Sequence, residues 1–142
     1  MWDFTPAGSK LFFVASTNRS EKIWVSDGTY AGTIELPAED QNWNYQVEAN
    51  SFEVSPDQEK FHGLLYFSGF NQGTGNELYV TDGKKVRMLA DLNPGAGSSM
   101  PGYFTQVGSN LFFYADDGVH GQEMWVYSAQ KVMDVYLPFA TQ

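Results

Sequence analysis

One short phrase occurs three times in this chain of 142 residues. It reads EKIWVSDG at 21–28, NELYVTDG at 76–83 and QEMWVYS at 122–128. Each copy follows an apolar triplet, LFF or LYF, that begins at residue 11, 65 or 111. The triplets are therefore spaced by 54 and then by 46 residues. A period in this range marks the repetition of one supersecondary unit.

Each repeat contains four short runs that are rich in aliphatic and aromatic residues, as β-strands are. The expected strands cover residues 3–7, 11–15, 23–26 and 33–36, then 51–55, 64–68, 78–81 and 86–89, then 103–107, 111–115, 124–127 and 132–137. No segment carries an apolar stripe of helical period. Asp27-Gly28 and Asp82-Gly83 predict tight hairpins, because Gly readily adopts the positive φ that such turns require. The sequence thus predicts an all-β fold of three four-stranded antiparallel units, each the size of a propeller blade.

We expect a single repeat domain over residues 1–142, with blades of about 1–48, 49–100 and 101–142. Propellers have about four to eight blades, so three blades do not close a ring. The phase of the repeats divides the chain into whole blades. We therefore expect two copies to complete a six-bladed β-propeller as a homodimer, since twofold pairs are the commonest oligomers. The rivals are a fragment of a longer propeller and a chain that docks on another protein.

Composition excludes several classes of partner and site. The net charge of −9 and the absence of a basic cluster larger than KKVR at 84–87 disfavour nucleic acid. No apolar run reaches the length of about 18 residues that spans a bilayer, so we expect no membrane insertion. The chain has no Cys, which excludes disulfides and thiolate metal sites.

Three longer stretches resemble the bacterial repeat family that is named for its ELWxxDGT motif. They read IWVSDGTYAGT at 23–33, DLNPGAGSSMP at 91–101 and ADDGVHGQEMW at 115–125. The resemblance implies β-propeller blades and a place outside the cell or at the cell surface, and it brings no single chemistry. Three positions depart from the motif: Lys22 replaces the glutamate, Tyr79 replaces the tryptophan, and Ser128-Ala129 replaces the Asp-Gly turn.

Trp24, Tyr79 and Trp125 occupy the same position of the repeated phrase. Flat aromatic rings at a propeller mouth could form a platform for a sugar. The alternative is packing between neighbouring blades, where large rings fill the space between two sheets. We predict that Trp24 and Trp125 pack between blades, and we keep Trp125 as a ligand-binding candidate.

Carboxylates and imidazoles give weaker signals. Glu77 and Glu123 precede two of these aromatics and could bind a ligand hydroxyl, or else a loop backbone. The acids Asp27, Asp82, Asp116 and Asp117 could hold calcium, but Asp before Gly is also favoured as a turn cap. His62 and His120 lack any partner at metal-binding spacing. The sequence therefore indicates no cofactor, no metal site and no catalytic residue, although a carboxylate pair brought together by the repeats is left open.

The segment QNWNYQ at 41–46 breaks the repeat and combines aromatic with amide side chains. This composition suits recognition of a sugar or a protein, and the alternative is an insertion folded back on its own blade. Its candidate ligand-binding residues are Asn42, Trp43, Asn44 and Tyr45.

The leading functional hypothesis is a non-enzymatic β-propeller that binds a glycan or a protein at the cell surface or outside the cell. The alternative is a structural propeller that assembles a larger machine and binds no small molecule. A third hypothesis is a glycoside hydrolase that uses two carboxylates.

Overall fold

The computed structural model describes residues 4–17, 20–38, 53–54, 64–108, 110–128 and 135–136. These residues form twelve β-strands and no helix, which confirms the all-β prediction. This part of the chain accordingly offers no helix that is long and apolar enough to cross a membrane.

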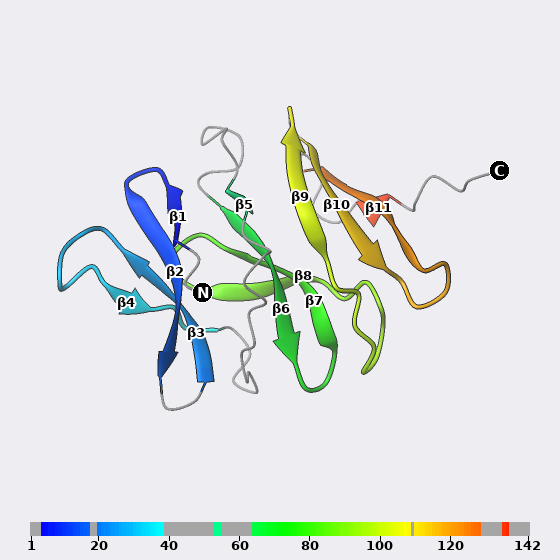
Figure 1. Ribbon diagram of the computed structural model, residues 1–142, viewed down its shortest axis with the longest axis horizontal. Coiled ribbons are helices and arrows are strands. Elements are labelled where there is room, and N and C mark those ends of the chain that lie inside the picture. Colours follow the sequence, from blue (N-terminus) through cyan, green and yellow to red (C-terminus); the bar gives the residue numbers. More distant parts are fainter. Residues whose placement is uncertain are drawn as a thin grey trace.

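The strands form three antiparallel sheets, each built from four consecutive strands (Figure 1). The first sheet contains β1 (Phe4–Ala7), β2 (Lys10–Thr17), β3 (Ser20–Ser26) and β4 (Ile34–Glu35). The second contains β5 (Glu53–Val54), β6 (Leu65–Asn71), β7 (Gly75–Thr81) and β8 (Val86–Ala90). The third contains β9 (Gly102–Val107), β10 (Asn110–Asp116), β11 (Gln122–Ser128) and β12 (Val135–Tyr136). Every expected strand has a counterpart, and the two central strands of each sheet are longer than expected.

The repeated phrases occupy the same place in each sheet. The triplet lies on the second strand and the phrase on the third, and they pair in matching register: Phe13 lies opposite Trp24, Phe67 opposite Tyr79, and Phe113 opposite Trp125. Because side chains alternate between the faces of a strand, this register places one aromatic pair on the same face of each sheet.

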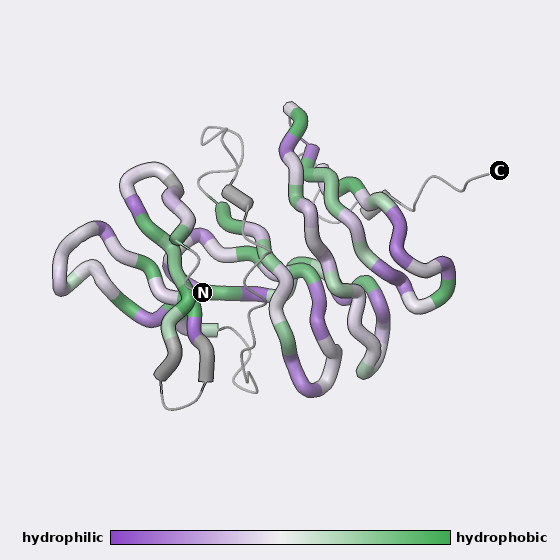
Figure 2. The backbone as a smooth tube through the Cα atoms, viewed as in Figure 1, coloured by the Kyte–Doolittle hydropathy of each residue, from purple (hydrophilic) through white to green (hydrophobic). Residues whose placement is uncertain are grey.

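Two hydrophobic cores join the three sheets. The first core packs one face of the first sheet against the second sheet and contains Phe12, Val14, Ile23, Val25, Leu36, Leu65, Phe67, Tyr79 and Val86. The second core joins the second and third sheets and contains Tyr66, Leu78, Val80, Leu92, Phe104, Leu111, Phe113, Ala115, Trp125 and Tyr127. Strand β7 therefore supplies both cores, since Tyr79 points to the first sheet while Leu78 and Val80 point to the third. Figure 2 shows hydrophobic stretches along the strands and hydrophilic residues at the β6–β7 turn.

The sheets lie side by side in chain order, with the second sheet between the other two (Figure 1). The first strands contribute to these contacts, because β1 lies against β5 and β9 lies against β6. The chain leaving the first sheet also bonds the second, where the Val86 amide donates to the Pro37 carbonyl oxygen at 2.8 Å. Each sheet is thus one layer of a continuous stack.

Both Asp-Gly pairs have the predicted positive φ at Gly, but a short hairpin connection forms only at residues 82–85, because the connection after β3 covers residues 27–33. Gly28 and Gly83 have φ values of 89° and 79°, and the Asp82 carboxylate caps its turn by accepting the Lys84 amide at 2.9 Å. Asp27 does the same for Thr29, from the amide at 2.9 Å and from the hydroxyl at 2.7 Å. Both aspartates therefore act as turn caps, and these bonds hold the pKa of Asp27 below its usual value.

Within one chain, Trp125 packs between sheets as predicted, whereas Trp24 does not. Trp125 is buried in the second core and its indole N–H donates to the Ala115 carbonyl at 3.1 Å. Trp24 is only half-buried, because it lies on the face of the first sheet that points away from the second. No other described sheet covers that face.

Candidate functional site

The candidate site is one end of the second and third sheets, where three connections meet. They are the β6–β7 turn (72–74), the β8–β9 link (91–101) and the β10–β11 turn (117–121). Hereafter these three segments are called the loop end. In Figure 1 the link runs beside both turns along one edge of the molecule.

Glu77 on β7 holds the link in place from inside. Its side chain is fully buried, and Oε2 accepts the Leu92 amide at 2.7 Å and the Ser99 hydroxyl at 2.6 Å. Oε1 accepts the Ser99 amide at 3.1 Å. Burial raises the pKa of Glu77, while the bonds from Ser99 and Leu92 oppose the rise. The Glu77 carboxylate therefore binds the backbone of a loop, which was the alternative to binding a ligand hydroxyl.

Ser99 connects both sheets through its backbone. Its amide donates to the Asn76 carbonyl at 2.9 Å, and its own carbonyl accepts the Asp116 amide at 2.8 Å. Asn76 is on β7 and Asp116 ends β10, so one buried residue of the link ties the second sheet to the third. The stretch DLNPGAGSSMP at 91–101 contains Ser99, but nothing in that stretch indicated that Ser99 would form hydrogen bonds to two sheets.

Close glycine contacts shape the rest of the loop end. Gly75 has a φ of 72°, and a side chain there would overlap the Gly97 carbonyl of the link. A methyl group on Gly118 would lie 2.7 Å from Asn93 Oδ1. Both glycines therefore let the link approach the hairpin turns directly.

The β10–β11 turn carries a charged pair on the surface. Asp117 Oδ1 accepts the amides of Val119 and His120 at 2.9 and 2.8 Å, and His120 Nδ1 lies 2.7 Å from Asp117 Oδ2. The His120 amide bond and the imidazole together lower the pKa of Asp117 to about 2. The same imidazole–carboxylate bond raises the pKa of His120.

Two exposed residues, one in the link and one at the start of β9, have unusual backbone geometry. Met100 and Tyr103 have φ values of 48° and 56°, which residues other than Gly rarely adopt. The ring of Tyr103 meets that of Tyr114 edge to face, with centroids 6.1 Å apart. Backbone strain often accompanies functional sites, and the sequence pattern did not indicate it at Met100 or Tyr103.

The other candidates are placed as follows. Glu123 occupies the position of Glu77 in the third sheet, and its Oε2 is buried with no hydrogen-bond partner in the described part of the chain. The residue that would correspond to Leu92 follows β12, outside the described residues. Asn42, Trp43, Asn44, Tyr45 and His62 also lie outside the described residues.

The described side chains bring no three acidic or histidine groups together as a metal site. Asp116 accepts the Gly118 amide at 2.7 Å, so the acids of the β10–β11 turn also serve as turn caps. The loop end is chemically a set of hydrogen-bonding backbone groups and exposed side chains on a rigid support, an arrangement that suits binding.

Comparison of the chain with protein-family models, curated proteins and solved structures gave no match. The resemblance to the ELWxxDGT repeats stays a prediction from the sequence.

Proposed function

We propose that the three sheets are successive blades of a β-propeller, and that this propeller is a non-enzymatic module that binds a glycan or a protein at the cell surface or outside the cell. The observation that carries the proposal is the loop end. There Glu77 and Ser99 fix an irregular link against two hairpin turns, while the sheets behind it supply a packed support. Recognition by loops on a rigid scaffold is a common arrangement for binding.

The arrangement of the sheets supports the blade assignment. Each sheet has four antiparallel strands in sequential order, neighbouring sheets pack face to face, and first strands approach the adjoining sheet. These are features of propeller blades around a central axis. Two chains of three blades would give six, which lies within the usual range of about four to eight.

The loop with Asn42, Trp43, Asn44 and Tyr45 belongs to the same proposal. It lies in the connection from β4 to β5, which corresponds in chain order to the β8–β9 link of the loop end. We assign Trp43 and Tyr45 as the aromatic contacts of the ligand, because rigid aromatic side chains supply contact area at low entropic cost.

A glycan array and a crosslinking screen against surface proteins test the proposal. We expect a ligand in one of them, and we expect the Trp43→Ala, Tyr45→Ala double variant to lose it while the protein stays folded. Tyr30→Ala is the matched control, because Tyr30 is fully exposed in the β3–β4 turn. This turn and the β4–β5 connection join opposite ends of β4. No ligand in either screen, or unchanged affinity of the double variant for a ligand found there, contradicts the assignment.

A further inference from the structure

The two outer sheets each leave one apolar face uncovered. On the first sheet, Phe4, Phe13 and Trp24 form a ring cluster, with centroids 5.8 Å apart for the first pair and 6.4 Å for the second. We call this cluster the aromatic face. On the third sheet, Phe112, Tyr114, Met124 and Val126 share the face that points away from the second sheet, and we call it the aliphatic face.

The aromatic face has a buried counterpart in the same chain. In the third sheet, Phe104, Phe113 and Trp125 hold the positions of Phe4, Phe13 and Trp24, and the Phe104 and Phe113 rings lie 5.7 Å apart. Phe104 is 2% exposed, whereas Phe4 is 61% exposed. The difference arises because the second sheet covers Phe104 and no described sheet covers Phe4.

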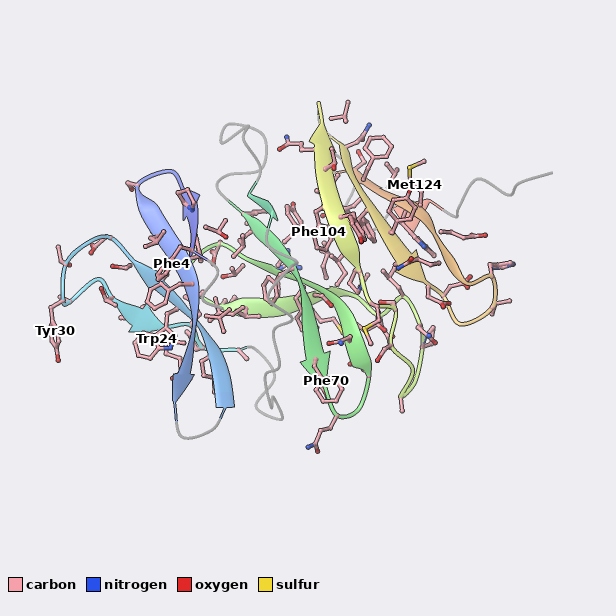
Figure 3. The ribbon with its side chains drawn as sticks, in the orientation of Figure 1. Phe4, Trp24, Tyr30, Phe70, Phe104 and Met124 are labelled. Carbon is pink, nitrogen blue, oxygen red and sulfur yellow. The ribbon has the colours of Figure 1, made fainter. Side chains whose placement is uncertain are left out.

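The aliphatic face also has a buried counterpart. The surface that receives Phe104, Phe113 and Trp125 consists of Tyr66, Leu78 and Val80 of the second sheet. These residues hold the positions of Phe112, Met124 and Val126 in the repeat. Leu78 is 0% exposed and Met124 is 37% exposed. Figure 3 shows the consequence: Phe104 lies between two sheets, while Phe4 and Met124 lie at opposite ends of the stack.

The indole of Trp24 differs from that of its buried counterpart in one hydrogen bond. The indole N–H of Trp24 is buried and has no hydrogen-bond partner among the described residues, while the equivalent N–H of Trp125 is bonded. The acceptor of the Trp125 bond is the Ala115 carbonyl of the same sheet, so this difference arises within each sheet. On the aliphatic face, Tyr114 and Met124 are 44% and 37% exposed, and a partner would cover this apolar surface.

We infer that the aromatic face of one chain docks on the aliphatic face of a second copy, in the way that the third sheet docks on the second within one chain. The partner is a second copy because this chain itself contains both halves of the contact. The two faces are different surfaces, so the contact is heterologous, and it closes into a ring only if two copies exchange it twice. The inference rests on the proposed propeller arrangement and adds to it the residues that meet.

Light scattering on the purified chain tests the inference through charged substitutions. We expect a wild-type particle of about 32 kDa, twice the chain mass of 15.9 kDa. Phe4→Lys and Met124→Lys each place a charge in the contact, and we expect each to weaken association by about 10-fold or more. Met88→Lys is the matched control, because Met88 has a similar exposure of 39% but lies on the middle sheet.

Mixing the two variants provides the decisive measurement. A mixed pair has one contact with both substitutions and one intact contact, whereas either variant alone has a substitution in both contacts. Because a contact that one Lys has broken loses little more from a second Lys, we expect the mixture to dimerise more tightly than either variant alone. Far-UV circular dichroism checks that each variant is folded, and Tyr114→Lys replaces Met124→Lys if the latter is not. A folded wild-type monomer at micromolar concentration overturns the inference, as does a mixture that shows no recovery. Binding in the glycan and crosslinking screens is read separately, so a monomer that binds its ligand contradicts this inference alone.

Discussion

Glu77 and Ser99 are 22 residues apart in the chain, and the Ser99 hydroxyl donates to Glu77 Oε2 at 2.6 Å inside the protein. The same carboxylate also accepts two backbone amides, so a single buried side chain fixes the link between the second and third sheets. Charge-assisted bonds of this kind are stronger than neutral ones, and their partners depend on one another. The shape of the loop end therefore depends on this pair.

Glu77→Gln should lower the free energy of unfolding by about 1–3 kcal/mol, because the amide NH2 cannot accept the bonds that a carboxylate oxygen accepts. Urea denaturation followed by fluorescence measures the change. Glu123→Gln is the control, since Glu123 Oε2 has no partner among the described residues, and it should cost less. Equal costs for the two variants would show that the Glu77 bonds do not stabilise the link.

Gly83→Val should destabilise the protein by at least about 1 kcal/mol, because a β-branched residue is strained at a φ of 79°. A Cβ there would also lie 3.2 Å from Phe12 of the first sheet. Gly28→Val separates the two effects, since Gly28 has a φ of 89° and no atom within 4 Å of its added Cβ. Thermal unfolding should rank Gly83→Val as the more damaging, and the reverse order would exclude a contact between the turn and Phe12.

Trp125→Ala should cost about 3–5 kcal/mol, the range for removing a large aromatic from a packed core. Trp24→Ala should cost less at low protein concentration, because Trp24 is half-buried within one chain. If two copies associate through the aromatic face, the cost of Trp24→Ala should grow with protein concentration. Differential scanning calorimetry at two concentrations measures both effects. A stable Trp125→Ala protein that had lost only ligand binding would restore the sugar-platform interpretation.

The Asp117–His120 pair should be visible in a pH titration. The carboxylate raises the pKa of His120 above its ordinary value of 6.5. The stabilising effect of this pair is therefore fully present below pH 6.5 and is lost as the pH rises through the raised pKa of the folded protein. Asp117→Asn keeps an oxygen that can cap the turn but removes the charge, so it should return the pKa of His120 toward 6.5. Proton NMR of the imidazole signals measures the pKa, and His120→Gln assigns the signal, since His62 is the other histidine. An unchanged pKa in Asp117→Asn would show that the pair does not form in solution.

The strand pattern, the two Asp-Gly turns and the grouping into three sheets could be predicted from the sequence, because each depends on residues that are close along the chain. Alternating side chains define a strand, and a Gly at positive φ defines its turn. The positions of Tyr79 and Trp125 within their strands follow in the same way. The resemblance to a repeat family adds an expectation about where the protein works, which nothing in the fold tests.

Tertiary structure alone decided the roles of equivalent residues. Trp24 and Trp125 have the same place in the repeat, yet Trp125 is buried and Trp24 is not, because the second sheet covers that face of the third sheet and no described sheet covers that face of the first. Glu77 accepts three hydrogen bonds from the link that follows its sheet, whereas Glu123 Oε2 has no hydrogen-bond partner among the described residues. No local pattern indicated that Ser99 would reach Glu77. A repeat determines which face a side chain occupies, whereas the number and order of the sheets determine whether another surface covers that face.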